Sequence, residues 1–321
     1  MSEINIINEN IHSIKTPYKD IFTTIYTIQT PKGALLFDTG SFDEDIPNYI
    51  IPMLSELGVE KEDLKYVFIS HNHKDHAGGL NELLNHFPSL TVLSRCPNLK
   101  EKYGERVNSF SDGDEILDCI SLVTIPGHTM DSSAVYDKRT KTLISGDCLQ
   151  LYGIFGSGLW ASNINYPTDH LEALKKLRSM DIEKVCTAHD YHPLGQIYTG
   201  KADVIKAIDS CIEPLDIISK LIDENDKLND EEIAAVYNSK GNLPTLGAHV
   251  VTAIRKTKEE NKMKKLCKIK EGKKLCGVCM GLARYFDIDV TLVRLALVAF
   301  TVLGGSGILA YIVAAIVMPE E

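Results

Sequence analysis

The feature that most constrains this chain is a run crowded with histidine and aspartate, His71-Asn72-His73-Lys74-Asp75-His76. It follows residues 66–70, a short and mostly apolar stretch that has the character of a buried strand. Side chains two apart at the end of a strand point to the same side, so His71 and His73 can act together. A tight turn would then bring Asp75 and His76 opposite them. Imidazole and carboxylate groups are ligands for Zn²⁺, and also for iron and manganese.

Three more residues of ligand type stand later in the chain, each after a strand-like run: His128, Asp147 and His189. A histidine cluster alone is a fairly specific sign of a metal site. It becomes much more specific when further ligands arrive from other strand ends, because polar residues gather where strands end at the edge of a sheet. The sequence therefore predicts one metal site built from several segments.

The rest of the first 260 residues has the pattern of an α/β domain with helices outside. Apolar runs bounded by turn residues predict strands at 22–28, 34–37, 66–70, 90–93, 121–125, 134–136, 142–145 and 185–188. Leucines at helical spacing predict helices at 76–86 and 169–180. Residues 203–260 have a helical pattern that a Gly/Pro-rich break interrupts at 241–247.

The ligand set, together with the upstream segment Leu36-Phe37-Asp38-Thr39-Gly40, resembles the metallo-β-lactamase-fold hydrolases, including hydroxyacylglutathione hydrolases (glyoxalase II) and N-acyl-homoserine lactonases. The resemblance covers residues 10–200 and matches all seven ligand positions. It implies a four-layer αβ/βα sandwich with the site at the edges of the sheets. A single buried histidine or aspartate is usually structural, but seven in the family's order argue against that reading.

The resemblance also implies a role for each position. One metal ion would be held by His71, His73 and His128. The other would be held by Asp75, His76 and His189. Asp147 would bridge them together with a water or hydroxide, and Asp38 would orient a ligand by hydrogen bonding. Zinc is the expected ion at both positions, with iron and manganese as alternatives.

Such a pair of ions would lower the pKa of the bridging water and polarise the oxygen of the scissile group. Asp75 is the predicted catalytic residue, because it can orient the hydroxide and later carry its proton to the leaving group. His73 stands where flavodiiron proteins use a carboxylate, and Asp147 stands where the best-known zinc β-lactamases use cysteine. The expected activity is therefore hydrolysis of a small ester, thioester or lactone, with phosphodiester or RNA cleavage less favoured.

Fewer residues indicate the substrate. Glyoxalase II proteins recognise glutathione through basic residues in a C-terminal helical part, and no matching cluster aligns here. Residues 151–167 are rich in glycine and aromatic residues and could form a wall of the pocket. The sequence leaves open whether substrate is contacted by Tyr166, His170, Tyr191 or His192.

Charge is distributed unevenly along the chain. The formal net charge is −10, yet residues 255–321 hold 12 Lys/Arg against 7 Asp/Glu, so residues 1–254 carry −15. Nucleic-acid binding needs clustered Lys/Arg, so no nucleic acid is expected as a partner. The basic run 256–274 precedes the apolar stretch 290–318, in which Arg294 is the only charge, and this order favours a membrane. Scattered cysteines and a polar N-terminal segment favour a reduced, cytoplasmic setting for the body.

The last part of the chain resembles the PspC (phage shock protein C) domain. The matching residues are Leu275–Gly281, the segment Leu282-Ala283-Arg284-Tyr285-Phe286, Asp287-Ile288-Asp289, Thr291-Leu292-Val293-Arg294-Leu295, and the Gly-rich apolar tail that ends in Met318-Pro319. The resemblance implies a small membrane-associated domain that is linked to envelope stress. Residues 290–318 can hold one spanning helix of roughly 20 residues, whereas the glycines at 304–307 also permit a helical hairpin, and the sequence does not decide between them.

We therefore predict two domains, a metallo-β-lactamase-fold hydrolase at residues 1–260 and a small helical domain at 261–321 that combines a basic juxtamembrane segment with a PspC-like transmembrane part. The chain would be tethered to the cell membrane with its catalytic domain facing the cytoplasm. The expected partners are a small-molecule substrate, inner-membrane lipid and a membrane stress-response protein. The alternative is an envelope-stress sensor or scaffold whose metal domain is regulatory.

Overall fold

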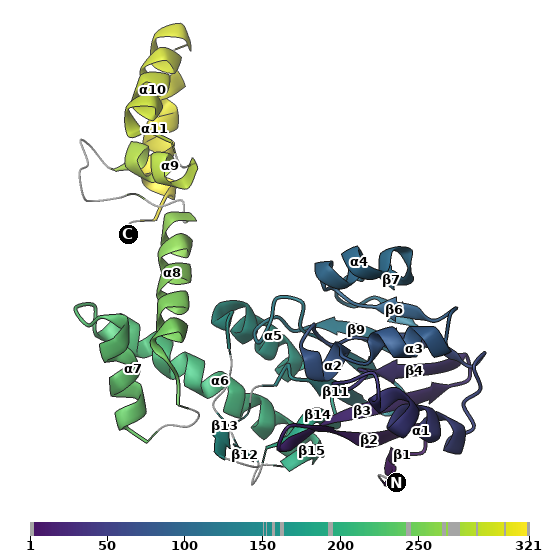
Figure 1. Ribbon diagram of the computed structural model, residues 1–321. Coiled ribbons are helices and arrows are strands. Elements are labelled where there is room, and N and C mark those ends of the chain that lie inside the picture. Colours follow the sequence, from purple (N-terminus) through teal and green to yellow (C-terminus); the bar gives the residue numbers. More distant parts are fainter. Residues whose placement is uncertain are drawn as a thin grey trace. The chain divides into compact units, whose positions relative to one another are not determined.

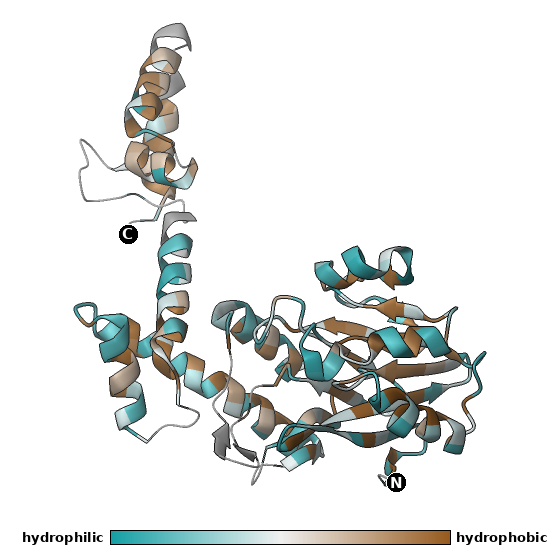
Figure 2. Ribbon diagram, in the orientation of Figure 1, coloured by the Kyte–Doolittle hydropathy of each residue, from teal (hydrophilic) through white to brown (hydrophobic). Residues whose placement is uncertain are grey.

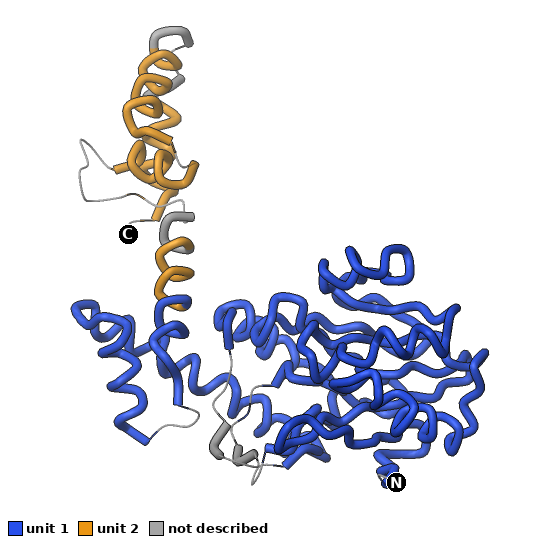
Figure 3. The backbone as a smooth tube through the Cα atoms, in the orientation of Figure 1, with its two compact units in different colours: residues 1–253 blue, residues 254–321 orange. Residues whose placement is uncertain are grey.

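A computed structural model describes residues 3–149, 151, 153–155, 158–160, 164–191, 195–241, 245–264, 268, 277–286, 288–304 and 306–319. The backbone alone is described at 153–155, 158–160, 261–264, 302–304 and 306–308. The chain divides into two compact units, residues 1–253 and 254–321 (Figure 3). The domain boundary that we expect after residue 260 stays a prediction. Helix α8 (Ala248–Lys264) contains both that position and the division between the two units after residue 253.

Two sheets form the body of the first unit (Figure 1). The first sheet has seven strands in sequence order: β1 (Asn5–Asn8), β2 (Ile11–Tyr18), β3 (Ile21–Thr30), β4 (Gly33–Phe37), β5 (Leu64–Phe68), β6 (Thr91–Leu93) and β7 (Val107–Asn108). The second sheet has the order β15-β14-β11-β10-β9-β8, with bounds Gly195–Thr199, Lys184–Tyr191, Thr142–Gly146, Ser133–Asp137, Ile120–Thr124 and Glu115–Ile116. Strands β4 to β7 are parallel, as are β11 and β14, whereas the other pairs are antiparallel. A separate hairpin joins β12 (Gly153–Phe155) to β13 (Gly158–Trp160).

Helices follow or separate these strands. Those of the first unit are α1 (Ile51–Glu56) after a π-helical turn (Ile46–Ile50), α2 (Lys74–Ala77), α3 (Leu80–His86), α4 (Pro97–Tyr103) with a 3₁₀ turn (Gly104–Arg106), α5 (Pro167–Ser179), α6 (Lys201–Glu224) and α7 (Asp230–Ser239). The predicted helical region 203–260 is thus occupied by α6, α7 and α8. Part of its predicted break, residues 242–244, lies outside the described residues.

The two sheets pack face to face around an apolar core. The rings of Phe37 and Phe68 stack in this core at a centroid distance of 5.3 Å, and they lie against Ile144 and Val135 of the second sheet. The phenol of Tyr26 on β3 donates to the carbonyl oxygen of Thr187 on β14 at 2.6 Å and so ties the sheets together.

Helices cover the outer face of each sheet. Leu80 and Leu83 of α3 pack on the first sheet, and Leu174 of α5 and Ile208 of α6 pack on the second. The predicted helix–sheet–sheet–helix layering is therefore present in the first unit. Strand β3 is buried along most of its length, as expected for a strand with a covered surface on both faces.

The second unit contains α9 (Val278–Phe286), α10 (Val290–Gly304) and α11 (Ser306–Val317). Helices α10 and α11 pack against one another, and α9 packs against both. The residues of these helices are predominantly apolar (Figure 2). Of the two alternatives that the sequence left open for 290–318, the structure has a pair of helices rather than one continuous helix. Within the described residues, none of the helices is both long enough and apolar enough to cross a membrane.

Candidate metal centre

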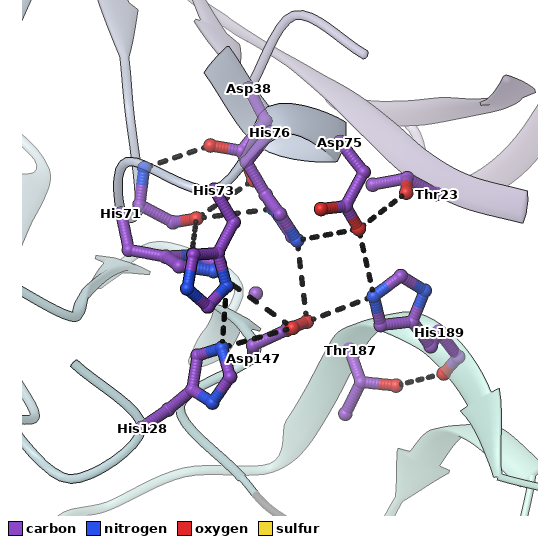
Figure 4. Close-up of polar contacts among 12 residues, drawn as sticks. Thr23, Asp38, His71, His73, Asp75, His76, His128, Asp147, Thr187 and His189 are labelled. Carbon is purple, nitrogen blue, oxygen red and sulfur yellow. Dashed lines mark hydrogen bonds and ion pairs between the residues drawn. The ribbon is translucent and has the colours of Figure 1, made fainter. Parts of the chain in front are cut away.

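The predicted ligand side chains converge where strand ends of both sheets meet (Figure 4). The first sheet supplies the loop after β5, which holds His71 and His73, and the short helix α2, which holds Asp75 and His76. The second sheet supplies the other three, from the loop after β9, from the residue that follows β11 and from β14: His128, Asp147 and His189. Residues far apart in sequence are therefore brought to one edge of the sandwich.

The donor atoms form three connected groups. Within each group, the ligand atoms lie no more than 4.8 Å from one another. The groups are His71, His73 and His128, then Asp75, His76 and His189, and between them His71, His76 and Asp147. The carboxylate oxygens of Asp147 lie 3.3 Å from His189 Nε2 and 3.8 Å from His128 Nε2, so this side chain stands between the two outer groups. His73 is half-buried while the other six are buried, so the centre opens to solvent on the His73 side.

Hydrogen bonds fix the orientation of three histidine rings. Nδ1 of His76 donates to Oδ2 of Asp38 at 2.7 Å, and Nδ1 of His189 donates to the carbonyl oxygen of Phe22 at 2.9 Å. Nδ1 of His71 lies 3.1 Å from the hydroxyl of Ser70. In each case the second nitrogen, Nε2, faces the cluster. Such support of the outer nitrogen is how metal-binding histidines are usually held.

Asp38 is held in an unusual backbone conformation. Its φ angle is 65°, in the left-handed region that a residue with a Cβ atom rarely adopts. The carboxylate accepts three hydrogen bonds, from the Ser70 backbone N–H, from the Ser70 hydroxyl and from His76. Strain of this kind persists where surrounding contacts compensate it, and it is frequent at functional sites. Asp38 therefore lies where an orienting role requires it.

Thr23 on β3 is a contact that the sequence did not indicate. Its hydroxyl donates to Oδ2 of Asp75 at 3.2 Å, and its side chain is fully buried. The neighbouring carbonyl oxygen of Phe22 holds His189. One strand of the first sheet thus positions two members of the cluster. A threonine in a strand is too ordinary to be singled out in a single sequence.

The loop that carries His128 is held by α5 and the residues before it. The side-chain amide of Asn165 donates to the carbonyl oxygen of His128 at 2.7 Å. Nδ1 of His170 donates to the carbonyl oxygen of Pro126 at 3.3 Å. A Cβ atom on Gly127 would lie 2.2 Å from His170 Nδ1, so only glycine fits there. His170 therefore supports this loop by its contacts with Pro126 and Gly127, and it is not among the clustered donors.

The other residues left open by the sequence lie in different places. Tyr191 is fully buried on β14, and Tyr166 is 41% exposed just before α5. His192 lies outside the described residues. Within the segment 151–167, Leu151 and Ile164 are buried, but the aromatic side chains at 152, 155 and 160 lie outside the described part of the chain.

Two glycines interrupt the helix that we predict over residues 76–86. Helix α2 ends at Ala77 and α3 begins at Leu80. A Cβ atom on Gly78 would lie 2.1 Å from the carbonyl oxygen of Ser41, and one on Gly79 would lie 2.5 Å from that of Thr39. The backbone of residues 39–42, which follow β4 and Asp38, therefore passes directly over these glycines, and its hydrogen bonds hold α2 against this segment.

The charges of the centre favour a cation. Burial disfavours the charged form of His189, but the carboxylates of Asp147 and Asp75 outweigh it and raise the pKa of His189 to about 10. Burial likewise opposes protonation of His76, yet Asp147, Asp38 and Asp75 raise its pKa well above the ordinary value. The Nε2 atoms of His71 and His76 are buried with no hydrogen-bond partner among the described residues. Nitrogen and carboxylate donors so arranged fit divalent ions of the zinc, iron and manganese type.

Comparison with known families agrees with this geometry. The sequence model of the Metallo-beta-lactamase superfamily matches residues 18–95, which include the histidine run. The model of the PspC domain matches residues 264–321.

Curated proteins have similar sequences over about half of this chain. A hydroxyacylglutathione hydrolase of Nostoc punctiforme is 32% identical over 144 residues, which cover 44% of this chain and 56% of that protein. A beta-lactamase-like protein 2 homolog of Caenorhabditis elegans is 25% identical over 172 residues, which cover 52% of this chain and 55% of that protein. The chain thus spans about half the length of these relatives.

Solved structures show the same fold. A metallo-beta-lactamase family protein from Thermus thermophilus superimposes with a TM-score of 0.53 at 18% identity, over 80% of this chain and 96% of that one. The rubredoxin:oxygen oxidoreductase of Desulfovibrio gigas gives 0.54 at 15% identity, over 78% of this chain and 75% of that one. These two names denote different chemistries, so the likeness establishes the fold alone.

The fold and the ligand cluster together define the class of protein. The first unit is a metallo-β-lactamase-fold domain, as the sequence predicts. The chain joins this domain to a PspC domain at residues 264–321, and both resemblances found in the sequence are confirmed.

Proposed function

We propose that this chain is a metal-dependent hydrolase that uses two divalent ions to cleave a small ester, thioester or lactone. The observation that carries the proposal is the connection of two three-residue groups through one carboxylate. His71, His73 and His128 form one group, Asp75, His76 and His189 form the other, and the carboxylate of Asp147 lies between them.

Two ions bound there would activate a water for attack and polarise the oxygen of the scissile bond. Asp75 is suited to handle the proton. Every contact described for its carboxylate, with Thr23, His76 and His189, is made by Oδ2. Burial alone would raise the pKa of Asp75, but His76 and His189 outweigh it and lower the pKa below the ordinary value. Asp75 is therefore a carboxylate at neutral pH, and its Oδ1 can take up a proton and release it to the leaving group.

The donors themselves favour hydrolysis over oxygen reduction. Five of the seven are histidines, and His73 occupies the position where flavodiiron proteins use a carboxylate. The donor set contains no thiolate, unlike that of the best-known zinc β-lactamases. Zinc is the expected ion, with iron and manganese as alternatives.

The relatives support an acyl substrate. Several similar curated proteins from Nostoc and Salmonella are named hydroxyacylglutathione hydrolases, and that name denotes cleavage of a thioester. A thioester is accordingly the first substrate class to test, followed by simple esters and lactones.

The PspC domain supports attachment of the hydrolase to a membrane. We place the first unit on the cytoplasmic side, because the run 256–274 carries nine lysines against three glutamates and basic segments stay on that side. The same domain match favours one alternative, a stress sensor or scaffold in which the metal centre is regulatory. In that case the chain would bind metal but would hydrolyse no substrate.

Purified full-length chain, stripped of metal and reloaded with zinc, iron or manganese, would distinguish these functions. The panel consists of a hydroxyacylglutathione, an aryl ester, a homoserine lactone and an aryl phosphodiester. We expect turnover of at least one acyl substrate, and loss of about 10²-fold or more in Asp75→Ala. The control Asp112→Ala removes a surface aspartate that pairs with Lys176 and should leave the rate unchanged. Bound metal without turnover on the whole panel would favour the sensor.

A further inference from the structure

The helical pair of the second unit has an unusual distribution of apolar side chains. Most of the large apolar residues that are exposed in the described structure lie on α9, α10, α11 and the segment between α9 and α10. On α10 and α11 they include Leu292, Leu295, Val298, Phe300, Leu309, Ile312, Val313, Ile316 and Val317, each at least 48% exposed. Monomeric soluble proteins rarely expose a contiguous apolar surface of this kind.

Helix α10 holds its only charged residue at a less exposed position and carries large apolar residues at exposed positions, although its first turn exposes Thr291. Its less exposed positions include Arg294, the only charge in the helix, and Thr301. Arg294 lines a cavity of about 180 Å³ together with Cys279 of α9 and Tyr311 of α11. The exposed positions Leu295 and Phe300 are apolar. A helix in water has the opposite arrangement, whereas charged residues of a helix in lipid face the interior of the bundle.

Helix α11 repeats this arrangement. Its less exposed positions after residue 308 are Tyr311 and two small residues, Ala314 and Ala315, whereas Ala310 is exposed. Ile316 and Val317 are 77% and 74% exposed. Small residues at helix contacts with large apolar residues outside are typical of helices that pack in lipid.

The end of α11 lies beside Lys268, a residue that precedes α9 in the chain. The backbone N–H of Lys268, in the segment before α9, donates to the carbonyl oxygen of Pro319 at 2.7 Å. The ammonium of Lys268 donates to the carbonyl oxygen of Ala315 at 2.8 Å. The chain therefore returns at the end of α11 to the side of Lys268.

The length of the helices limits how deep the pair can reach. Helix α10 has 15 residues, which at 1.5 Å per residue gives a length of about 22 Å. The apolar part of a bilayer is about 30 Å thick. A pair that starts at one face would pass the middle of the bilayer and end before the opposite face.

We propose that the second unit enters an anionic bilayer as a re-entrant hairpin, with α10 and α11 in the lipid and with Lys268 and Pro319 on the same, cytoplasmic face. Charge complementarity supports lipid as the occupant, because the basic run 256–274 precedes the hairpin and attracts anionic headgroups. The exposed apolar residues lie along both helices. Lipid would cover all of them, whereas the groove of a single protein partner would cover only one side. This proposal rests on the membrane attachment in the proposed function, and not on hydrolysis.

The sidedness of the chain end tests the proposal. Full-length chain with an epitope tag after Glu321 is expressed in bacterial cells, and protease is added to spheroplasts and to inverted membrane vesicles. We expect the tag and the first unit to be digested together in inverted vesicles and to be protected together in spheroplasts. Digestion of the tag in spheroplasts, with the first unit protected, would show a single crossing and overturn the hairpin.

Outward-facing lysines test lipid as the occupant. Leu295→Lys and Ala299→Lys place a charge on the exposed face of α10, and each should reduce the share of chain in the membrane fraction about tenfold or more. Thr291→Lys, at the exposed start of the same helix, is the matched control and should stay with the membrane. A wild-type chain that remains in the soluble fraction as a defined oligomer would overturn the proposal. Asp147→Ala should partition like wild type even where it abolishes hydrolysis, so the two proposals fail separately.

Discussion

Asp38 and His76 are joined by a hydrogen bond of 2.7 Å between two side chains that are both fully buried. The bond fixes the ring of His76 so that Nε2 faces Asp75 and Asp147, at 3.3 Å and 3.5 Å. The strained backbone of Asp38 is the local cost of placing a carboxylate behind this ring.

Replacing this carboxylate should weaken metal binding. Asp38→Asn keeps the shape of the side chain but loses the charge that orients His76, and we expect the metal affinity to fall about 10–100-fold. Competition with a chromophoric chelator measures this change. The matched control is Asp45→Asn, a buried aspartate that accepts from the backbone of Ser41 and Phe42 and touches no clustered donor. Equal metal affinity in wild type and Asp38→Asn would contradict the orienting role.

Thr23 should affect turnover more than folding. Thr23→Val removes the hydrogen bond to Asp75 and preserves the volume of the side chain. A hydrogen bond to a charged group is worth about 1.5–3 kcal/mol, so we expect the rate of hydrolysis to fall about tenfold or more. Thr27→Val, on the same strand and equally buried, changes a hydroxyl that contacts Met53 and should leave the rate near wild type. If the rate of hydrolysis fell equally in Thr23→Val and Thr27→Val, the role of Thr23 would be structural only.

The close approach at Gly78 should make it intolerant of any side chain. Its backbone is ordinary, so the cost of Gly78→Ala comes from the contact with the Ser41 carbonyl oxygen. We expect the free energy of unfolding to fall by about 3 kcal/mol or more, as in other overpacked sites. Gly58→Ala is the comparison, because that glycine has φ +66° and nothing within 4 Å, and its backbone strain costs about 1–2 kcal/mol. Urea denaturation followed by circular dichroism measures both, and equal losses would contradict the packing argument.

His170 should make stability depend on pH. Burial lowers the pKa of His170 to about 4, whereas an unfolded histidine has a pKa of about 6.5. Between these values the unfolded chain binds a proton that the folded chain does not, so stability is lost as the pH falls through this window. At pH 5 the loss from this group is about 2 kcal/mol relative to pH 7.

The variant His170→Gln keeps a donor for the Pro126 carbonyl oxygen but does not titrate. Its free energy of unfolding should change less between pH 7 and pH 5 than that of wild type, by about 2 kcal/mol. The other histidines titrate in both proteins and cancel in the comparison. The same pH dependence in wild type and variant would show that His170 is not buried in its neutral form.

The sequence predicts the main strands because their apolar residues must be buried, and the ligands because they stand where those strands end. It does not predict strand β2, Ile11–Tyr18, because this strand mixes threonine, lysine and serine with isoleucine, and its place between β1 and β3 is set by tertiary pairing. It predicts α2 and α3 as one helix, since the contact that separates them at Gly78 involves Ser41, far away in sequence.

The supporting contacts of the centre could not be read from sequence for a similar reason. Thr23, Asn165 and the carbonyl oxygen of Phe22 reach the cluster only because two sheets fold over one another. The roles assigned to the seven ligands, the number of ions and the membrane attachment stay predictions. The grouping of the seven side chains allows the role of each one to be tested by substitution.

The central claim is that seven side chains hold two ions whose presence permits hydrolysis. The most direct measurement is a titration of metal-free, full-length chain with Zn²⁺, in which bound metal and the rate of thioester hydrolysis are recorded at each step. We predict saturation at two ions per chain, with a rate that rises as the second ion binds, and loss of both properties in Asp147→Ala. Full activity in the metal-free chain, or in Asp147→Ala, would contradict the account.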